Sequence, residues 1–258
     1  MDTLHRKVTG PFGSVEAAES LGLSRERARR LLAYLAERGW LARVRRGLYA
    51  LVPLRAGEPA EWREDPWVVA AKALAPCYIG GWSACEHWEV TEQIFRDIVV
   101  VTGRGVRSSN VEIQGTAFRL KSLPKAKHFG TRNVWKARVR VAVSDPTRTI
   151  VDVLDDPSIG GGIRHIADVI DAYFAGEHRD DKRLVEYANR RGNRTVFKRL
   201  GYLVEALGVE SDTLVHACRA GLSAGLSLLD PSSRRKGRIS TRWNLRVNAD
   251  VARKKLPS

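Results

Sequence analysis

The stretch SVEAAESLGLSRERARRLLAYLAERGWLARVRRGLYALV, residues 14–52, decides the fold of the N-terminal region. Ser14 is expected to cap a short helix that ends at Gly22, and Ser24 is expected to cap a second helix. Gly39 is the expected end of this second helix. Apolar residues recur in it at helical spacing and predict a stripe that faces a small core: Ala28, Leu31, Leu32 and Leu35.

A β-hairpin with a basic tip is predicted directly after the second helix. Its turn is Arg45-Arg46-Gly47, and its strands carry apolar side chains at Leu41, Val44, Leu48, Tyr49 and Leu51. Two helices joined by a tight turn and followed by such a hairpin make a winged helix-turn-helix, which places its second helix in a DNA major groove. A further helix normally precedes these two, and we expect it to be short, absent or supplied from elsewhere.

Arginine residues in the second helix and the hairpin are the candidates for DNA contacts. Recognition helices read bases with their N-terminal residues, and arginine can bind guanine through two hydrogen bonds. We therefore expect Arg25, Arg27 and Arg30 to lie in the major groove, with Arg29 and the capping Ser24 beside them. A solvated helix face is the alternative, because arginine is a good helix former. Three hairpin residues suit phosphate or minor-groove contacts: Arg43, Arg45 and Arg46.

The positive charge of the chain is concentrated at its two ends. The net charge is +15 over 258 residues. Residues 1–60 carry 11 basic and 6 acidic side chains, and residues 232–258 carry 9 and 1, whereas residues 61–231 carry 24 and 22. This distribution predicts that nucleic acid meets the ends of the chain, while the nearly neutral middle has another role.

Composition argues against several other classes of protein. No apolar run approaches the twenty or so residues of a membrane span, and no signal peptide precedes the fold, so we expect a cytoplasmic location. The three cysteines are few and widely spaced, which favours buried free thiols over disulfides. A zinc site at Cys77, Cys85 and His87 lacks the paired ligand spacing of such sites, and no metal or cofactor is expected.

Two domains are predicted, a winged helix at residues 1–55 and a larger domain at residues 66–258. The proline-rich residues 53–66 would link them. The larger domain is predicted to be mixed α/β (α+β) with a helical C-terminal half broken at Gly176, Gly192 and Gly208. Its first part should hold a helix at 67–75, a helical turn at 83–88 and strands at 95–101, 111–113, 117–120 and 138–143. A helix at 147–154 and a last strand at 242–247 complete the prediction.

The predicted helix at 147–154 begins with a good start signal. Asp145 can cap its N-terminus, and Pro146 suits its first position. Asp152 falls on the same side of this helix. We interpret this pattern as a structural cap with Arg148 as a surface residue. Another helix is expected to pack into the core through an apolar stripe flanked by Arg199 and Glu205: Leu200, Leu203, Val204 and Leu207.

The order of several motifs resembles the AbiEi-type antitoxins of bacterial AbiE phage-defence systems. The N-terminal helix-turn-helix and its wing are the first of these motifs. Four later stretches are also similar to that family: GWSACEHW at 81–88, DPTRTIVD at 145–152, KRLGYLVE at 198–205 and RWNLRVN at 242–248. The resemblance extends over nearly the whole chain.

This resemblance implies a repressor that is also an antitoxin. Family members bind inverted repeats ahead of their own operon through the winged helix. Their C-terminal domain counteracts a co-encoded nucleotidyltransferase-like toxin, with or without direct contact. The resemblance therefore implies operator DNA and a toxin as partners, a monomer or dimer on DNA, and no catalytic residue.

Two alternatives to an antitoxin are open. A regulator whose second domain senses a small ligand would need a concave apolar pocket. A metal-dependent nuclease would use Asp97 and Glu112 on adjacent strands, with Gln114 where such enzymes place a lysine. A separate question is the basic tail, which could bind phosphates of DNA or RNA, bind an acidic toxin surface, or be a solvated loop: Arg234, Arg235, Lys236 and Arg238.

Overall fold

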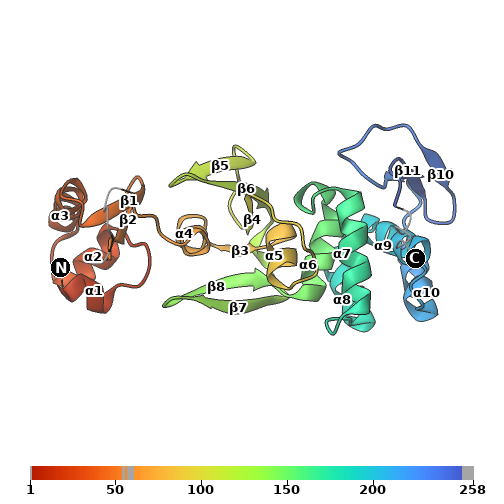
Figure 1. Ribbon diagram of the computed structural model, residues 1–258, viewed down its shortest axis with the longest axis horizontal. Coiled ribbons are helices and arrows are strands. Elements are labelled where there is room, and N and C mark those ends of the chain that lie inside the picture. Colours follow the sequence, from red (N-terminus) through yellow and green to blue (C-terminus); the bar gives the residue numbers. More distant parts are fainter. Residues whose placement is uncertain (1, 54–55, 57–60, 252–258) are drawn as a thin grey trace. The chain divides into compact units, whose positions relative to one another are not determined.

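The structure is a computed structural model that describes residues 2–53, 56 and 61–251 (Figure 1). The chain forms two compact units, one of residues 1–79, 96–125 and 133–143 and the other of residues 80–95, 126–132 and 144–258. Parts of the expected linker and of both predicted domain ends lie outside the described residues. None of the described helices combines the length and apolarity that crossing a membrane requires.

The N-terminal elements of the first unit follow the predicted order. They are α1 (Asp2–Lys7), α2 (Ser14–Leu21), α3 (Arg25–Glu37), β1 (Leu41–Arg45) and β2 (Leu48–Leu51). The helix expected ahead of α2 is thus present and short. Ser14 does not cap α2, because Gly13 occupies that position and donates its backbone N–H to the Glu16 carboxylate at 3.0 Å. One small core joins these elements: Leu4, Phe12, Ala17, Ala28, Leu32, Leu41 and Tyr49.

A six-stranded mixed sheet forms most of the remainder of the first unit. Helix α4 (Pro66–Ala73) precedes it, capped by the Asp65 carboxylate. The strand order is β5-β6-β4-β3-β8-β7. The bounds in chain order are β3 (Cys77–Ile79), β4 (Ile98–Thr102), β5 (Asn110–Ile113), β6 (Thr116–Ser122), β7 (Thr131–Lys136) and β8 (Val139–Ser144).

Two of these strands were not predicted from the sequence. The first, β3, has only three residues and follows Pro76, so it lacks a readable alternation. The second, β7, is an edge strand with mostly polar, exposed side chains. The other predicted strands of this sheet are confirmed, with their ends displaced by a few residues.

The second unit is predominantly helical. Its helices are α5 (Gly81–His87), α6 (Pro146–Asp155), α7 (Ile163–Ala175), α8 (Asp181–Arg191), α9 (Thr195–Ala206) and α10 (Asp212–Ala220). The predicted breaks at Gly176, Gly192 and Gly208 are confirmed. Short 3-10 turns lie at Lys125–Lys127 and Pro157–Ile159, and a small sheet contains β9 (Ser227–Leu228), β10 (Arg238–Ser240) and β11 (Leu245–Val247). The predicted mixed α/β fold with a helical C-terminal half is therefore confirmed.

The interpretation of Arg148 as a surface residue is wrong. Nearly all of α6 is buried, and Arg148 has no exposed surface. Its Nε lies 2.9 Å from Oδ1 of Asp152, and its guanidinium carbon lies 3.9 Å from the centre of the Phe129 ring. Asp145 caps α6 as predicted, accepting the Arg148 backbone N–H at 2.7 Å. A carboxylate and an aromatic face thus accommodate the buried cation.

Gly201 allows a close approach between α9 and the turn that joins β10 to β11. A Cβ atom at this position would overlap the six-membered ring of Trp243. The Trp243 side chain is buried, and its indole N–H donates to Glu205 at 2.7 Å. Because this hydrogen bond holds the ring in place, residue 201 cannot carry a side chain without displacing packed atoms.

We expect Gly201→Ala to destabilise the protein although alanine favours helices. The propensity gain of about 1 kcal/mol is opposed by overpacking, which costs about 1–3 kcal/mol and more against a held ring. Urea unfolding should show a net loss of stability. The control Gly225→Ala, at a loop position with open space around the added methyl group, should change stability by less than about 0.5 kcal/mol. A Gly201→Ala protein as stable as the wild type would contradict the packing argument.

Removing the carboxylate beside Arg148 should be strongly destabilising. Asp152→Ala removes the carboxylate that lies 2.9 Å from the buried Arg148 guanidinium, and breaking a buried ion pair costs about 3–5 kcal/mol. Urea unfolding followed by circular dichroism measures the loss. The double variant Arg148→Met/Asp152→Leu removes both charges and should be more stable than Asp152→Ala. Equal stability of the single variant and the wild type would show that the ion pair is not needed.

Candidate nucleic-acid interface

A tight turn and an N-cap set the start of α3. Gly22 takes a left-handed conformation at φ 65° and ends α2. Ser24 follows with extended backbone, and its hydroxyl accepts the backbone N–H of Arg27 at 3.3 Å. The predicted cap is confirmed. Because the cap is part of the turn between the two helices, it fixes where the first turn of α3 begins.

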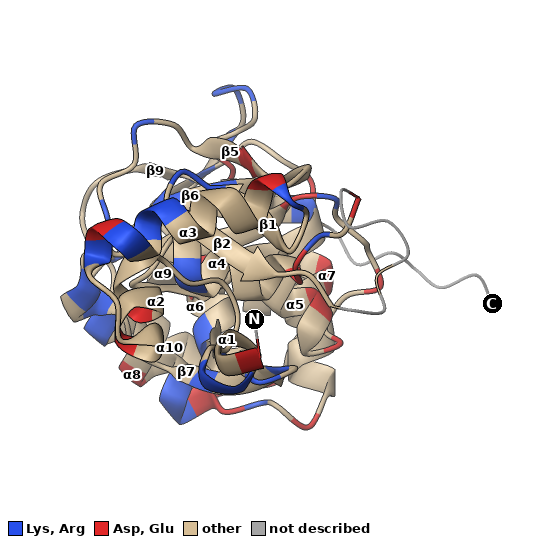
Figure 2. Cartoon of the chain, turned by 90° about the vertical axis from the view of Figure 1, so that its left-hand side faces the viewer, with Lys and Arg blue, Asp and Glu red and all other residues tan. Residues whose placement is uncertain are grey.

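The arginine side chains of α3 lie on its exposed side. Ala28 and Leu32 are fully buried, and Arg25, Arg27, Arg29 and Arg30 are exposed. Figure 2 shows the resulting basic segments along α3. Arg30 lies 3.6 Å from Glu26, and both side chains are 70% exposed. An ion pair this exposed contributes little, so Arg30 can exchange Glu26 for an external anion.

The wing is a short antiparallel hairpin with a basic tip. Strands β1 and β2 pair from Leu41↔Leu51, and their register shifts between Arg43 and Arg45. Gly47 takes φ 77° at the turn. The hairpin is tied to the chain ahead of α2, because Phe12 and Tyr49 exchange backbone hydrogen bonds of 2.8 and 2.9 Å. The three predicted wing residues are exposed: Arg43, Arg45 and Arg46.

Sequence reasoning missed one cation beside the wing. Partial burial lowers the pKa of Arg45, and the nearby charge of Arg104 lowers it further. Arg104 is exposed and follows β4 in the chain. In the sequence it stands between two glycines, Gly103 and Gly105, a pattern that does not by itself indicate a contact with the wing. Only the tertiary structure places this guanidinium near the wing.

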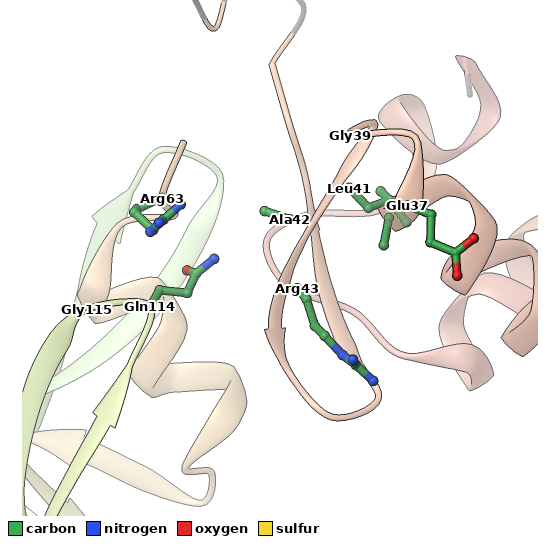
Figure 3. Close-up of a pocket in the computed structure, with 9 residues that line it drawn as sticks. Glu37, Gly39, Leu41, Ala42, Arg43, Arg63, Gln114 and Gly115 are labelled. Carbon is green, nitrogen blue, oxygen red and sulfur yellow. The ribbon is translucent and has the colours of Figure 1, made fainter. Parts of the chain in front are cut away.

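A polar hollow lies between the end of α3, β1 and the turn joining β5 to β6 (Figure 3). Arg63 and Gln114 line one side, and Glu37, Leu41 and Arg43 line the other. Charged and amide groups dominate this lining. It does not match the apolar pocket that a ligand-sensing regulator would need.

The arrangement expected for a metal-dependent nuclease is wrong. Asp97 precedes β4 and Glu112 lies on β5, but β6 separates these strands. Two strand spacings amount to about 10 Å, so the pair does not lie on neighbouring strands. Among the described residues, no group of three or more histidine, cysteine or acidic side chains could hold a metal ion.

The cysteines are free thiols, as predicted. Cys85 and Cys218 are buried, and Cys77 is partly buried. Burial raises the pKa of Cys85 to about 12 and that of Cys77 to about 11. These thiols are therefore protonated at neutral pH, a state that suits packing better than metal binding.

The basic tail lies on the surface of the second unit. Its backbone is anchored where the Asn248 amide donates to the Arg234 carbonyl at 3.0 Å. The side chains themselves are exposed: Arg234, Arg235, Lys236 and Arg238. Whether these cations contact phosphates, an acidic protein surface or only solvent stays a prediction.

One comparison with known protein families matches the N-terminal segment of the chain. Residues 1–52 match the model of a family described as transcriptional regulator, AbiEi antitoxin. This match confirms the resemblance to AbiEi-type antitoxins for that segment. The four later stretches that resemble the family lie beyond it. No curated protein sequence matches the chain.

The fold also resembles a solved structure. The RV2827C protein from Mycobacterium tuberculosis has 16% sequence identity and a TM-score of 0.62. The match covers 95% of this chain and 88% of the other. At this sequence identity the similarity establishes a shared fold over nearly the whole chain, but it does not establish a shared function.

Substitutions at Ser24 should separate its capping role from DNA contact. Ser24→Ala removes the acceptor for the Arg27 N–H and should cost about 0.5–2 kcal/mol of stability. Ser24→Asp keeps a cap and should preserve stability, but its charge should weaken DNA binding where α3 enters a groove. Thermal unfolding and DNA titration test the two effects. Unchanged DNA affinity in Ser24→Asp would place the helix start away from DNA.

Proposed function

We propose that this protein represses its own operon by binding inverted repeats, and that it counteracts a co-encoded nucleotidyltransferase-like toxin. The observation that carries the proposal is the exposed arginine row on a capped α3, within the segment that matches the AbiEi antitoxin regulators. DNA binding is assigned to residues 1–55 and toxin neutralisation to residues 66–258. Direct contact with the toxin is left open.

The proposed DNA contacts follow from helix and groove dimensions. An α-helix with its side chains is about 10–12 Å wide and fits a major groove about 12 Å wide. Arg27 and Arg30 are three residues apart and project from neighbouring positions of one helix side. Together with Arg25 they can reach guanine edges, with Arg29 nearby. The wing arginines and Arg104 would bind phosphates and add salt dependence.

Two copies of the protein would bind one operator. An inverted repeat presents two half-sites related by a two-fold axis, and each would receive one α3. A dimer, or two monomers placed by the repeat, meets this requirement. A cytoplasmic location is proposed because operator DNA and the toxin would both be found there.

Loss of one recognition arginine should weaken operator binding. Arg27→Ala or Arg30→Ala removes a contact to a base edge and should cost about 1–3 kcal/mol of binding free energy. Titration with DNA from upstream of the operon measures this loss of binding free energy, and a scrambled duplex measures non-specific binding. Arg38→Ala is the matched control, because Arg38 is exposed at the other end of α3. Equal losses in all three variants would indicate a general charge effect only.

DNA binding and toxin neutralisation should be separable in the full chain. The Arg27→Ala/Arg30→Ala double variant should rescue growth from the induced toxin as well as the wild type does. Its operator affinity should meanwhile fall. Colony counts with the toxin expressed from an independent promoter test this expectation. Failure of the variant to rescue growth, at normal protein level, would contradict the proposed division between the domains.

A further inference from the structure

Strands β7 and β8 form a hairpin at the edge of the six-stranded sheet (Figure 1). This hairpin is basic and carries an exposed tryptophan. Residues 131–144 contain four basic side chains and no carboxylate. Trp135 on β7 is 62% exposed. The guanidinium carbon of Arg140, on the neighbouring strand β8, lies 5.4 Å from the centre of its ring. The hairpin thus presents an aromatic ring beside a cation.

The cations of this hairpin differ in their surroundings within the fold. Lys136 lies 4.8 Å from the ring of the partly buried Trp67, so its cation covers another tryptophan. Arg138 at the hairpin turn and Arg140 are both exposed. In the portion of the chain that the structure describes, no carboxylate pairs with these three cations. Their charge is available to an external anion.

The chemistry of the hairpin selects among partners. A second copy pairing along β7 is disfavoured, because it would bring like charges together at the sheet edge. An acidic protein would satisfy the cations but would leave the tryptophan ring without a specific use. Nucleic acid supplies both phosphates for the cations and flat bases for the ring.

Unpaired RNA fits better than a duplex. Bases inside a duplex are stacked on one another, so their faces are closed to a side chain. Single-stranded RNA segments can turn their bases outward, onto aromatic rings and arginine planes. Trp135 provides such a ring, and the neighbouring Arg140 provides such a guanidinium plane.

We propose that the β7–β8 hairpin is a second nucleic-acid site, which binds unpaired RNA by stacking a base on Trp135. Arg140 supports the stacked base, and Arg138 and Lys136 attract the flanking phosphates. None of these residues belongs to the proposed operator-binding set. RNA binding at this hairpin therefore does not depend on operator binding by α3.

Anisotropy of a fluorescein-labelled ten-nucleotide oligouridylate, titrated with the full-length protein, tests the site. Trp135→Ala should raise Kd by about 5- to 140-fold, the change that matches the usual ~1–3 kcal/mol for stacking one base. Trp135→Phe should retain most of the affinity because a flat ring remains. Trp40→Ala is the matched control, since Trp40 is 46% exposed between α3 and β1, and it should bind as the wild type does.

Titrations with other variants and other ligands show which surface of the protein binds the RNA. The Arg27→Ala/Arg30→Ala variant should keep its RNA affinity, which would separate this site from α3. Unchanged affinity in Trp135→Ala would overturn the proposal. Tighter binding of single-stranded DNA or of an RNA duplex than of the oligouridylate would also overturn it, when measured in the Arg27→Ala/Arg30→Ala variant so that α3 does not contribute. Displacement of RNA by polyglutamate from wild type and Trp135→Ala alike would indicate an acid-binding protein surface instead.

Discussion

Burial of one side of α3 is the constraint on which the proposed DNA-binding geometry depends. Ala28 and Leu32 have no exposed surface, and they lock the rotation of the helix against the core of the winged helix. Residues outside this buried stripe then face solvent, with Arg30 opposite the stripe and Arg27 and Arg29 on its flanks. The Ser24 cap fixes the other degree of freedom, the point where the helix starts. Rotation and start together determine which side chains can reach a base.

The second unit depends on a buried helix whose two ends are satisfied by side chains. Backbone groups at helix ends lack partners within the helix, which is costly in a buried setting. Asp145 accepts an N–H at the start of α6. At its end, buried Arg199 donates to the carbonyls of Leu154 and Asp155, at 2.6 and 3.2 Å, and also to those of Leu228 and Leu229. One guanidinium thereby joins α6, α9 and β9.

Charge in this protein serves two physically different purposes. Arg148 and Arg199 are buried, and their cations meet a carboxylate, an aromatic ring or carbonyl groups within the fold. The arginines of α3, the wing and the β7–β8 hairpin are exposed and can meet external phosphates. Composition alone cannot separate these groups, because the residue type is the same. Burial separates them, and burial is a property of the packed structure.

Local sequence patterns were enough to predict the α2–α3 turn, the wing, the cap at Asp145 and the helix breaks at glycine. These features depend on neighbouring residues, through apolar period, capping and backbone freedom. Packing between distant segments was needed to show that Arg148 is buried, that β6 separates Asp97 from Glu112, and that Arg104 lies beside the wing. These outcomes depend on strand order and on packing between distant segments, which local pattern does not encode.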